Sequence, residues 1–310
     1  MVVEGAFNLL FRPGLRKDFR DTFEMYKPEY PLYLKVSTTD MPEQQASIIT
    51  GPSRMFELAD GAPVSYDDPK LGPKVVGVDK EYGLGFVITR RAVEDDQYNK
   101  ANQAAKWLAH AARMTMEYRS ALFLDDAFTG TYFKGIDGKK LCATDHTLIN
   151  STSTWANTPS TQVGLSVTGI TNLIDLATIQ VDQNGDPRPM NCDTLVIGTN
   201  TGDQNRALQI WHSKLEPFTS DNQENALKLR MGMANGNMPR KDPIVSHFKS
   251  SRRSYFLIDS RYNDAHFVIR RDVQMEDTHD FDTGAAKYKT TCRFLVWFVD
   301  PIGWYGCNPS

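Results

Sequence analysis

The chain has 310 residues, of which 40% are hydrophobic and 24% are charged, a composition typical of a globular protein with room for a sizeable core and for two domains. Its formal net charge of −3 argues against a general nucleic-acid-binding protein, since such proteins are usually basic. No apolar run is long enough to span a membrane, and the N-terminal region lacks the basic-then-apolar order of a signal peptide.

The first 54 residues are predicted to form an arm. Residues 15–26 have the pattern of a short amphipathic helix, and Pro28 and Pro31 end it. Residues 32–38 then have the pattern of a strand.

Residues 55–90 are predicted to form a long, flat β-hairpin. The run from Lys74 to Arg90 is rich in Val and aromatic residues, which favours a strand. Three prolines and two glycines in residues 60–73 favour turns and irregular extended chain. Because an isolated two-stranded ribbon is marginally stable in water, this hairpin must lie on another surface. The alternative is an ordinary surface hairpin that lies on its own domain.

Residues 93–129 are predicted to form one long helix. Acidic residues occupy its first turn, apolar residues recur at three- and four-residue spacing, and Gly130 ends it. At 1.5 Å per residue, about 35 residues span roughly 50 Å. The apolar stripe is mostly Ala, so we expect another element to pack closely along it. The alternative is a plain core helix of a large α+β domain.

The rest of the chain is predicted to form a smaller α/β unit followed by strands. Residues 221–240 are polar and are predicted to be a loop. Strands from both ends of the chain are expected to meet around the long helix. The sequence therefore predicts an α+β protein with two lobes, the second covering roughly residues 160–263. The remaining predicted elements are helices at residues 166–181 and 203–212 and strands at residues 194–198, 255–260, 265–271 and 287–299.

No motif in the sequence specifies catalysis, a metal or a cofactor. Asp145 and His146 suggest an acid-oriented base, but no nucleophile lies at a recognisable elbow, so His146 is interpreted as structural. Residues 182–193 begin like a calcium loop, but Pro187 stands where that loop needs Gly. The acidic run at residues 277–282 is interpreted as a solvated loop or a charge partner of another subunit. The four cysteines lack CxxC spacing and are expected to be reduced thiols of a protein made in a cytoplasm.

Four segments carry a resemblance to a known family. The first is the run from Tyr82 to Arg90 followed by the acidic triplet of residues 94–96. The others are residues 137–146, residues 221–225, and the ending from Asp300 to Gly306. Together, in this order, they resemble the Mu-type major head subunits of tailed bacteriophages. The resemblance covers about residues 56–306 and rests on the ordered set of segments.

The resemblance implies an α+β protein with the HK97-like fold of tailed-phage major capsid proteins. It implies a peripheral domain built on a long spine helix, and an axial α/β domain whose loops cluster at the centres of hexamers and pentamers. By this resemblance, residues 1–54 are the N-terminal arm and residues 55–92 are the extended loop (β-hairpin). The peripheral domain comprises residues 93–159 and 264–310 and contains the spine helix at residues 93–129. The axial domain comprises residues 160–263.

The function implied by the resemblance is that of a major capsid protein, a structural protein and not an enzyme. It would self-assemble as a homo-oligomer of hexamers and pentamers into the icosahedral capsid of a virion, in the cytoplasm of a bacterial host. The shell would enclose double-stranded DNA without sequence-specific binding, without a cofactor and without a membrane. Further expected partners are a portal, decoration proteins and a scaffolding protein. We expect scaffolding to be a separate chain because only a short arm follows Met1.

Contacts between subunits are predicted on the hairpin and near its base. Tyr66, Tyr82 and Phe86 are the candidate apolar anchors. Cations near the base are expected to pair across a subunit boundary with acids of the run at residues 277–282. The candidate cations are Lys80, Arg90 and Arg91, and the candidate acids are Asp277, Asp280 and Asp282.

Three other functions remain open at this point. A tail or adaptor component of a virion is one, although a β-rich tube-former would lack so long a helix. An encapsulin-like nanocompartment shell shares the fold and would need a cargo-binding pocket. A hydrolase with an unrecognised site around His146 or His279 is the third.

Overall fold

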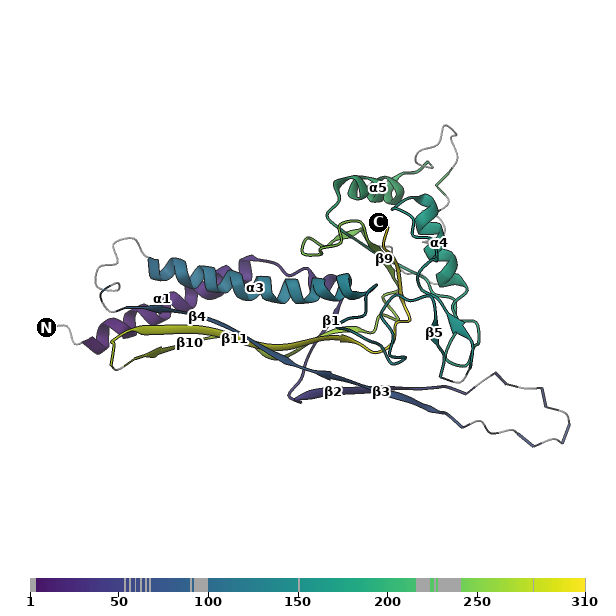
Figure 1. Ribbon diagram of the computed structural model, residues 1–310, viewed down its shortest axis with the longest axis horizontal. Coiled ribbons are helices and arrows are strands. Elements are labelled where there is room, and N and C mark those ends of the chain that lie inside the picture. Colours follow the sequence, from purple (N-terminus) through teal and green to yellow (C-terminus); the bar gives the residue numbers. More distant parts are fainter. Residues whose placement is uncertain are drawn as a thin grey trace.

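The computed structural model of the chain is elongated (Figure 1). The helices α1 (Glu4–Met25) and α3 (Lys100–Asp126) lie along a long sheet, a compact lobe with α4 (Val167–Thr178) and α5 (Thr201–His212) lies at the end away from the N-terminus, and a hairpin projects beyond the sheet (Figure 1). No helix in the described part of the chain is long and apolar enough to cross a membrane. The structure describes residues 4–309 except 53, 56, 59, 62, 65, 67, 90, 92–99, 150, 216–223, 226, 228–240 and 281.

The long sheet has four strands in the order β1-β10-β11-β4. β1 and β10 pair in parallel, and the other neighbours pair antiparallel. Every second residue of β11 is buried, so one face of the sheet is covered and the other faces outward. The strands are β1 (Lys35–Thr38), β4 (Lys80–Ile88), β10 (Ala265–His279) and β11 (Ala286–Phe298).

The covered face of the long sheet packs against α3 (Lys100–Asp126) and α1 (Glu4–Met25). Near the end of α3, the ring of Phe123 meets that of Phe298 in β11 edge to face, with centroids 5.8 Å apart. Aromatic side chains therefore fill the core near the end of α3.

The Ala stripe of α3 packs closely against α1. Ala105 is buried in one apolar cluster with Leu15 of α1, and Ala109 is buried in another with Phe19 of α1. The small side chains of α3 allow the two helices to approach each other. The predicted close packing along this stripe is confirmed, and its partner is the N-terminal helix.

The compact lobe is built on a second sheet in the order β12-β9-β7-β8. Every residue of β7, β9 and β12 is buried, as expected for strands that are covered on both faces. The strands are β7 (Thr194–Ile197), β8 (Ile244–Val245), β9 (Tyr255–Ile258) and β12 (Trp304–Cys307).

Two capped helices cover this second sheet, and both were predicted from the sequence. α4 (Val167–Thr178) begins after Ser166, whose Oγ accepts a hydrogen bond from the Gly169 amide at 3.1 Å. α5 (Thr201–His212) begins after Asn200, whose side chain accepts from the Gly202 amide at 2.9 Å. The short elements that complete the fold are η1 (Tyr30–Leu32), β5 (His146–Thr147) and β6 (Thr154–Trp155).

The predicted hairpin at residues 55–90 is wrong in its pairing. The hairpin consists of β2 (Glu43–Ile49) and β3 (Leu71–Val78), whereas β4 leaves it and pairs with β11. The break falls at Asp79, which is buried and contacts the guanidinium groups of Arg270 and Arg293 in the long sheet. These ion pairs fix the chain at the point where it changes sheets.

Three other predicted boundaries also differ from the structure. The N-terminal helix begins at Glu4 instead of residue 15, and β10 continues to His279 instead of ending at residue 271. Within residues 264–310, assigned above to one domain, β12 joins the second sheet through its pairing with β9. The start of the predicted long helix, residues 93–99, lies outside the described residues.

Candidate functional site

The buried histidine of the sequence motif is held by two side chains. His146 is fully buried, with Nδ1 2.5 Å from Oδ2 of Asp137 and Nε2 3.2 Å from Oδ1 of Asn157. Its ring stacks on Trp155 with centroids 4.6 Å apart. The sequence neighbour Asp145 turns away and pairs with Lys139. Both ring nitrogens are therefore engaged, and His146 links the loop at Asp137 to the β5–β6 pair.

The Asp137 carboxyl group shows how strongly this pair interacts. Burial raises the pKa of this carboxyl group, but the interaction with His146 and the backbone hydrogen bonds, among them that of the Lys139 amide, together outweigh it. The pKa of Asp137 therefore lies below its usual value. The Asp137–His146 pair connects the loop at Asp137 to the segment that begins at His146.

The acidic run pairs with cations of its own chain. Asp277 forms an ion pair with Arg16 of α1 at 2.9 Å, and Asp280 forms one with Lys287 of β11 at 2.9 Å. The hydrogen bond from Lys287 is the main cause of the lowered pKa of Asp280. The Asp282 amide donates to the Asp280 carboxylate at 3.2 Å. No group of three His, Cys, Asp or Glu suited to a metal ion occurs among the described residues.

The predicted cations lie elsewhere. Lys80 begins β4, close to the root of the hairpin, and Arg91 is exposed at the far end of β4. Arg90 lies outside the described residues. The pairing of these cations with the acids of a second subunit stays a prediction.

Two of the three predicted anchors pack inside their own chain. Tyr82 and Phe86 belong to β4 and not to the hairpin. Tyr82 stacks on Phe294 with centroids 4.7 Å apart, and Phe86 stacks on Tyr288 at 5.0 Å. The antiparallel register places Phe86 directly opposite Tyr288, and it places Tyr82 opposite Cys292, so that Tyr82 reaches Phe294 as a diagonal neighbour.

The third anchor lies on a projecting surface that the chain does not cover. Residues 51–70, called here the hairpin tip, connect β2 to β3. Tyr66 is 95% exposed and Met55 is 99% exposed. Such a concentration of exposed apolar side chains marks an interaction surface. Among the described residues of the tip, the large apolar side chains that are exposed are Met55, Leu58, Val64 and Tyr66.

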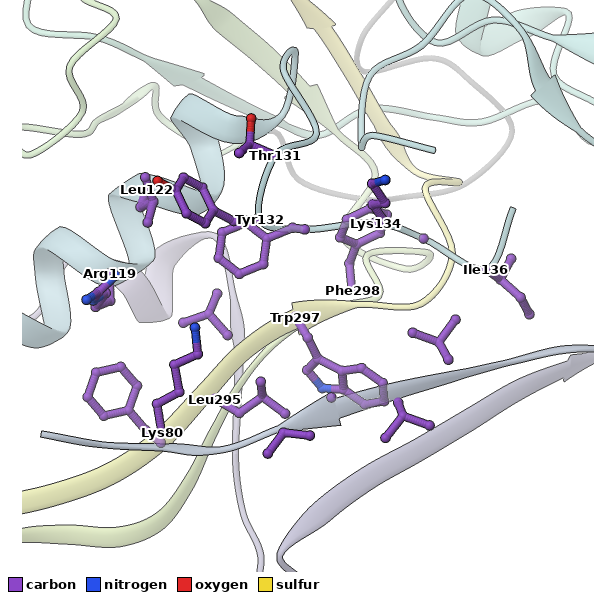
Figure 2. Close-up of a pocket in the computed structure, with 18 of the residues that line it drawn as sticks. Lys80, Arg119, Leu122, Thr131, Tyr132, Lys134, Ile136, Leu295, Trp297 and Phe298 are labelled. Carbon is purple, nitrogen blue, oxygen red and sulfur yellow. The ribbon is translucent and has the colours of Figure 1, made fainter. Parts of the chain in front are cut away.

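A groove of about 600 Å³ lies at the root of the hairpin, between β3, β4, β11 and the loop that follows α3. Figure 2 shows Arg119 and Leu122 on α3, Tyr132 and Lys134 on the loop, and Trp297 on β11. We call this cavity the root groove. Its volume is within the range of ligand pockets, about 300–1,000 Å³.

The root groove is apolar inside and basic at its edge. Its lining contains no acidic residue. No described carboxylate forms an ion pair with any of its cations. The cations are Lys74, Lys80, Arg119 and Lys134, and the main apolar residues are Leu122, Tyr132, Leu295, Trp297 and Phe298.

The sequence predictions missed this groove. One signal for it exists in β11, where Leu295 and Trp297 occupy outward positions that alternate with the core residues. The same face carries Lys287 and Lys289 further along the strand. Two large apolar residues at outward positions indicate a covered surface, but the sequence does not say which segment covers it.

The end of α3 fixes one wall of the root groove. The Asp126 carboxylate accepts hydrogen bonds from the backbone amides of Thr131 at 2.7 Å and of Tyr132 and Phe133 at 2.8 Å each. A helix C-terminus normally disfavours an anion, so these donors compensate for the charge. The loop that carries Tyr132 and Lys134 is thereby tied to the helix.

Comparison with known proteins identifies the family. A sequence profile described as phage capsid protein matches residues 76–306, about three quarters of the chain. A search of curated proteins found no match.

Solved structures show the same architecture. The chain is similar to the capsid structure of the cyanophage P-SCSP1u, with a TM-score of 0.56 and 11% identity over 90% of this chain and 86% of that one. It is similar to a structure from Microbacterium phage Oxtober96, with a TM-score of 0.54 and 9% identity over 92% of each chain. A third is the procapsid of bacteriophage JBD30, with a TM-score of 0.51 and 12% identity over 99% of this chain and 77% of that one. The fold is therefore HK97-like, as predicted, and the chain belongs to the phage capsid protein family.

Proposed function

We propose that this protein is the major subunit of a phage head, where it forms the hexamers and pentamers of an icosahedral shell around double-stranded DNA. The observation that carries the proposal is the hairpin tip, which exposes Met55 and Tyr66 almost completely. Exposed apolar surface of this kind marks a site of interaction with another molecule. In a shell, that molecule is a neighbouring subunit.

The shape of the subunit suits a closed ring. The hairpin projects beyond the body of the chain (Figure 1). A projection that meets a different surface of the next copy makes a heterologous contact, and such contacts close into rings when the rotation fits. Stable shells need large interfaces with apolar cores, and the hairpin tip supplies apolar area far from the core of its own chain.

The finer parts of the proposal rest on the sequence resemblance. The long sheet with α1 and α3 would be the peripheral domain, and the lobe with α4 and α5 would be the axial domain. The subunit would be of the Mu type and would assemble in the cytoplasm of the bacterial host. A separate scaffolding protein, a portal and decoration proteins are the partners that this reading implies.

Replacing four large apolar residues of the hairpin tip, all of them described and exposed, with Ser tests the proposal. We expect the M55S/L58S/V64S/Y66S variant to fold with an unchanged Tm because these side chains do not pack in the core. We expect it to lose shell formation, measured by size-exclusion chromatography with light scattering and by negative-stain microscopy.

A matched control removes apolar side chains that are exposed elsewhere. Met25 and Met41 are each 67% exposed, and neither lies on the hairpin tip. The M25S/M41S variant is expected to assemble like the unmodified protein. Normal shells from the four-residue variant would contradict a role of the hairpin tip in assembly.

A further inference from the structure

We propose that the loop between β8 and β9, residues 246–254, is a latch between α3 and the compact lobe, and that proton uptake by Lys249 opens it. This segment is called the latch loop below. The inference goes beyond the proposed function, because it concerns a movement within one subunit and does not require copies to assemble.

One side of the latch loop is tied to the long helix and to the segment before η1 by carboxylates. Asp125, the penultimate residue of α3, accepts hydrogen bonds from the Ser250 amide at 2.8 Å and the Ser251 amide at 3.0 Å. Glu29, which lies between α1 and η1, accepts the His247 amide at 3.0 Å, and its other oxygen lies 2.6 Å from Nδ1 of that ring. The loop is thereby joined to the part of the chain that carries the long sheet.

The other side of the latch loop packs against the compact lobe. The Ser246 amide donates to the carbonyl of Ile197, the last residue of β7, at 3.0 Å. The Arg252 carbonyl lies so close to Gly198 that no side chain would fit between them. The loop therefore fills the joint between the two parts of the subunit.

Lys249 is the buried residue in the middle of this loop. Its side chain is 3% exposed, whereas the nearby His247 and Ser250 are exposed. Its Nζ donates to the Ser254 carbonyl and lies 5.1 Å from the centroid of the Phe256 ring. Among the described residues, no carboxylate forms an ion pair with Lys249. An ammonium group has three donors and a full charge, so burial with one hydrogen bond favours its neutral form.

The charges that face Lys249 do not offset its burial. Burial lowers the pKa of Lys249 to about 7, and the carboxylates of Asp125 in α3 and Asp203 in α5 oppose this shift only in part. Arg206 and Arg253 also interact with Asp203 and share its charge. The amine therefore loses its proton far more readily in the closed latch than in an open, solvated loop.

Proton uptake therefore favours the open latch. In an open loop the amine reaches water and has its ordinary pKa of 10.5. Between this pH and about 7, the open loop binds a proton that the closed latch excludes. Opening accordingly becomes about tenfold more favourable for each unit by which the pH falls. Below about pH 7 Lys249 is charged in both states, so the slope ends.

The other shifted groups at this joint do not titrate in the same window. Burial raises the pKa of Glu117, which accepts the Glu29 amide, to about 7, so this group is ionised in both states at higher pH. Burial also raises the pKa values of Tyr30 and Tyr33 above the usual 10. The slope between these limits therefore reports on Lys249.

Hydrogen–deuterium exchange of the full chain between about pH 7.5 and about pH 9.5 tests the inference, with rates corrected for the intrinsic pH dependence of exchange. We expect the protection of peptides that cover residues 246–254 to rise about tenfold per pH unit. Peptides from the buried strand β7 should remain protected throughout. Loop protection that does not rise with pH would overturn the inference.

Lys249→Met removes the titrating amine and keeps an unbranched side chain. We expect loop protection in this variant to be independent of pH in the same window. Lys35→Met is the matched control, because Lys35 is exposed in β1, and it should keep the full slope. An unchanged slope in K249M, or an equal loss of slope in K35M, would overturn the assignment to Lys249.

Asp125→Asn tests the contact with α3. It weakens the two charge-assisted hydrogen bonds from the loop amides, so loop protection should fall about tenfold at every pH. The slope should remain, because Lys249 is unchanged. Protection equal to that of the unmodified chain would overturn the latch. All of these readouts concern one subunit, so their failure would leave the proposed shell function standing.

Discussion

At the scale of single residues, Glu117 is an ionisable group that the fold holds away from water. Its side chain is 2% exposed, and one carboxylate oxygen accepts the Glu29 amide at 2.9 Å. The other oxygen is buried and has no hydrogen-bond partner among the described residues. Burial raises the pKa of Glu117 to about 7.

This shift predicts a dependence of stability on pH. The folded state holds the Glu117 proton up to about pH 7, whereas the unfolded chain releases it near its ordinary pKa of 4.5. The free energy of unfolding therefore falls as pH rises between these values, by up to roughly 3 kcal/mol for this group. Glu117→Gln should remove this part of the slope, because glutamine keeps the hydrogen bond to Glu29 and does not ionise.

Urea denaturation of the unassembled subunit at several pH values between 5 and 8 measures this slope. Glu24→Gln is the matched control, because Glu24 is an exposed glutamate of α1. An E117Q variant whose stability parallels that of the unmodified protein across the whole range would contradict the assignment.

At the scale of elements, Asp126 joins the longest helix to the loop that forms one wall of the root groove. Its carboxylate is 3% exposed and accepts backbone hydrogen bonds from three consecutive residues, 131–133. Thr129 adds a hydroxyl donor at 2.6 Å. One side chain thus determines where α3 stops and how the loop leaves it.

Asp126→Asn is expected to destabilise the subunit by about 3 kcal/mol, because charge-assisted bonds weaken and one oxygen is replaced by a donor. Thermal or urea unfolding measures the loss. Asp21→Asn on the exposed face of α1 serves as the control and should change stability little. A loss for D126N as small as that for D21N would show that the loop holds its position without this carboxylate.

Local signals in the sequence predicted many of the helices and strands, but not which strands pair with one another. The starts of α4 and α5 follow from capping residues next to amphipathic runs, so both helices were predictable. The separation of β3 from β4 was not, because it depends on Asp79 meeting Arg270 and Arg293, about 200 residues further along the chain. The alternation of apolar and polar residues in β4 indicates that one face of the strand is buried, but it does not indicate which strand lies beside it.

The candidate site was predictable only in part, for the same reason. The exposure of Tyr66 could be predicted, because its segment has too few apolar residues to fold on itself. The root groove could not, because four separate segments meet to form it, and its basic edge combines Lys80, Arg119 and Lys134. Tyr82 and Phe86 resembled interface anchors in the sequence, but they stack within their own sheet.

At the scale of the whole molecule, the subunit combines a well-packed body with an uncovered projection. The body has aromatic cores beneath α3 and within the second sheet, and strands covered on both faces. The hairpin tip carries exposed apolar and acidic side chains that do not pack in the core of the body. Such an arrangement is expected when part of the stability of a protein resides in contacts between copies.

Negative-stain microscopy of the purified chain, with its mass measured by light scattering over a range of concentrations, tests the central claim most directly. The account predicts closed shells, or rings of six and five subunits that associate further as concentration rises. A particle that remains a single subunit at every concentration and ionic strength would contradict it.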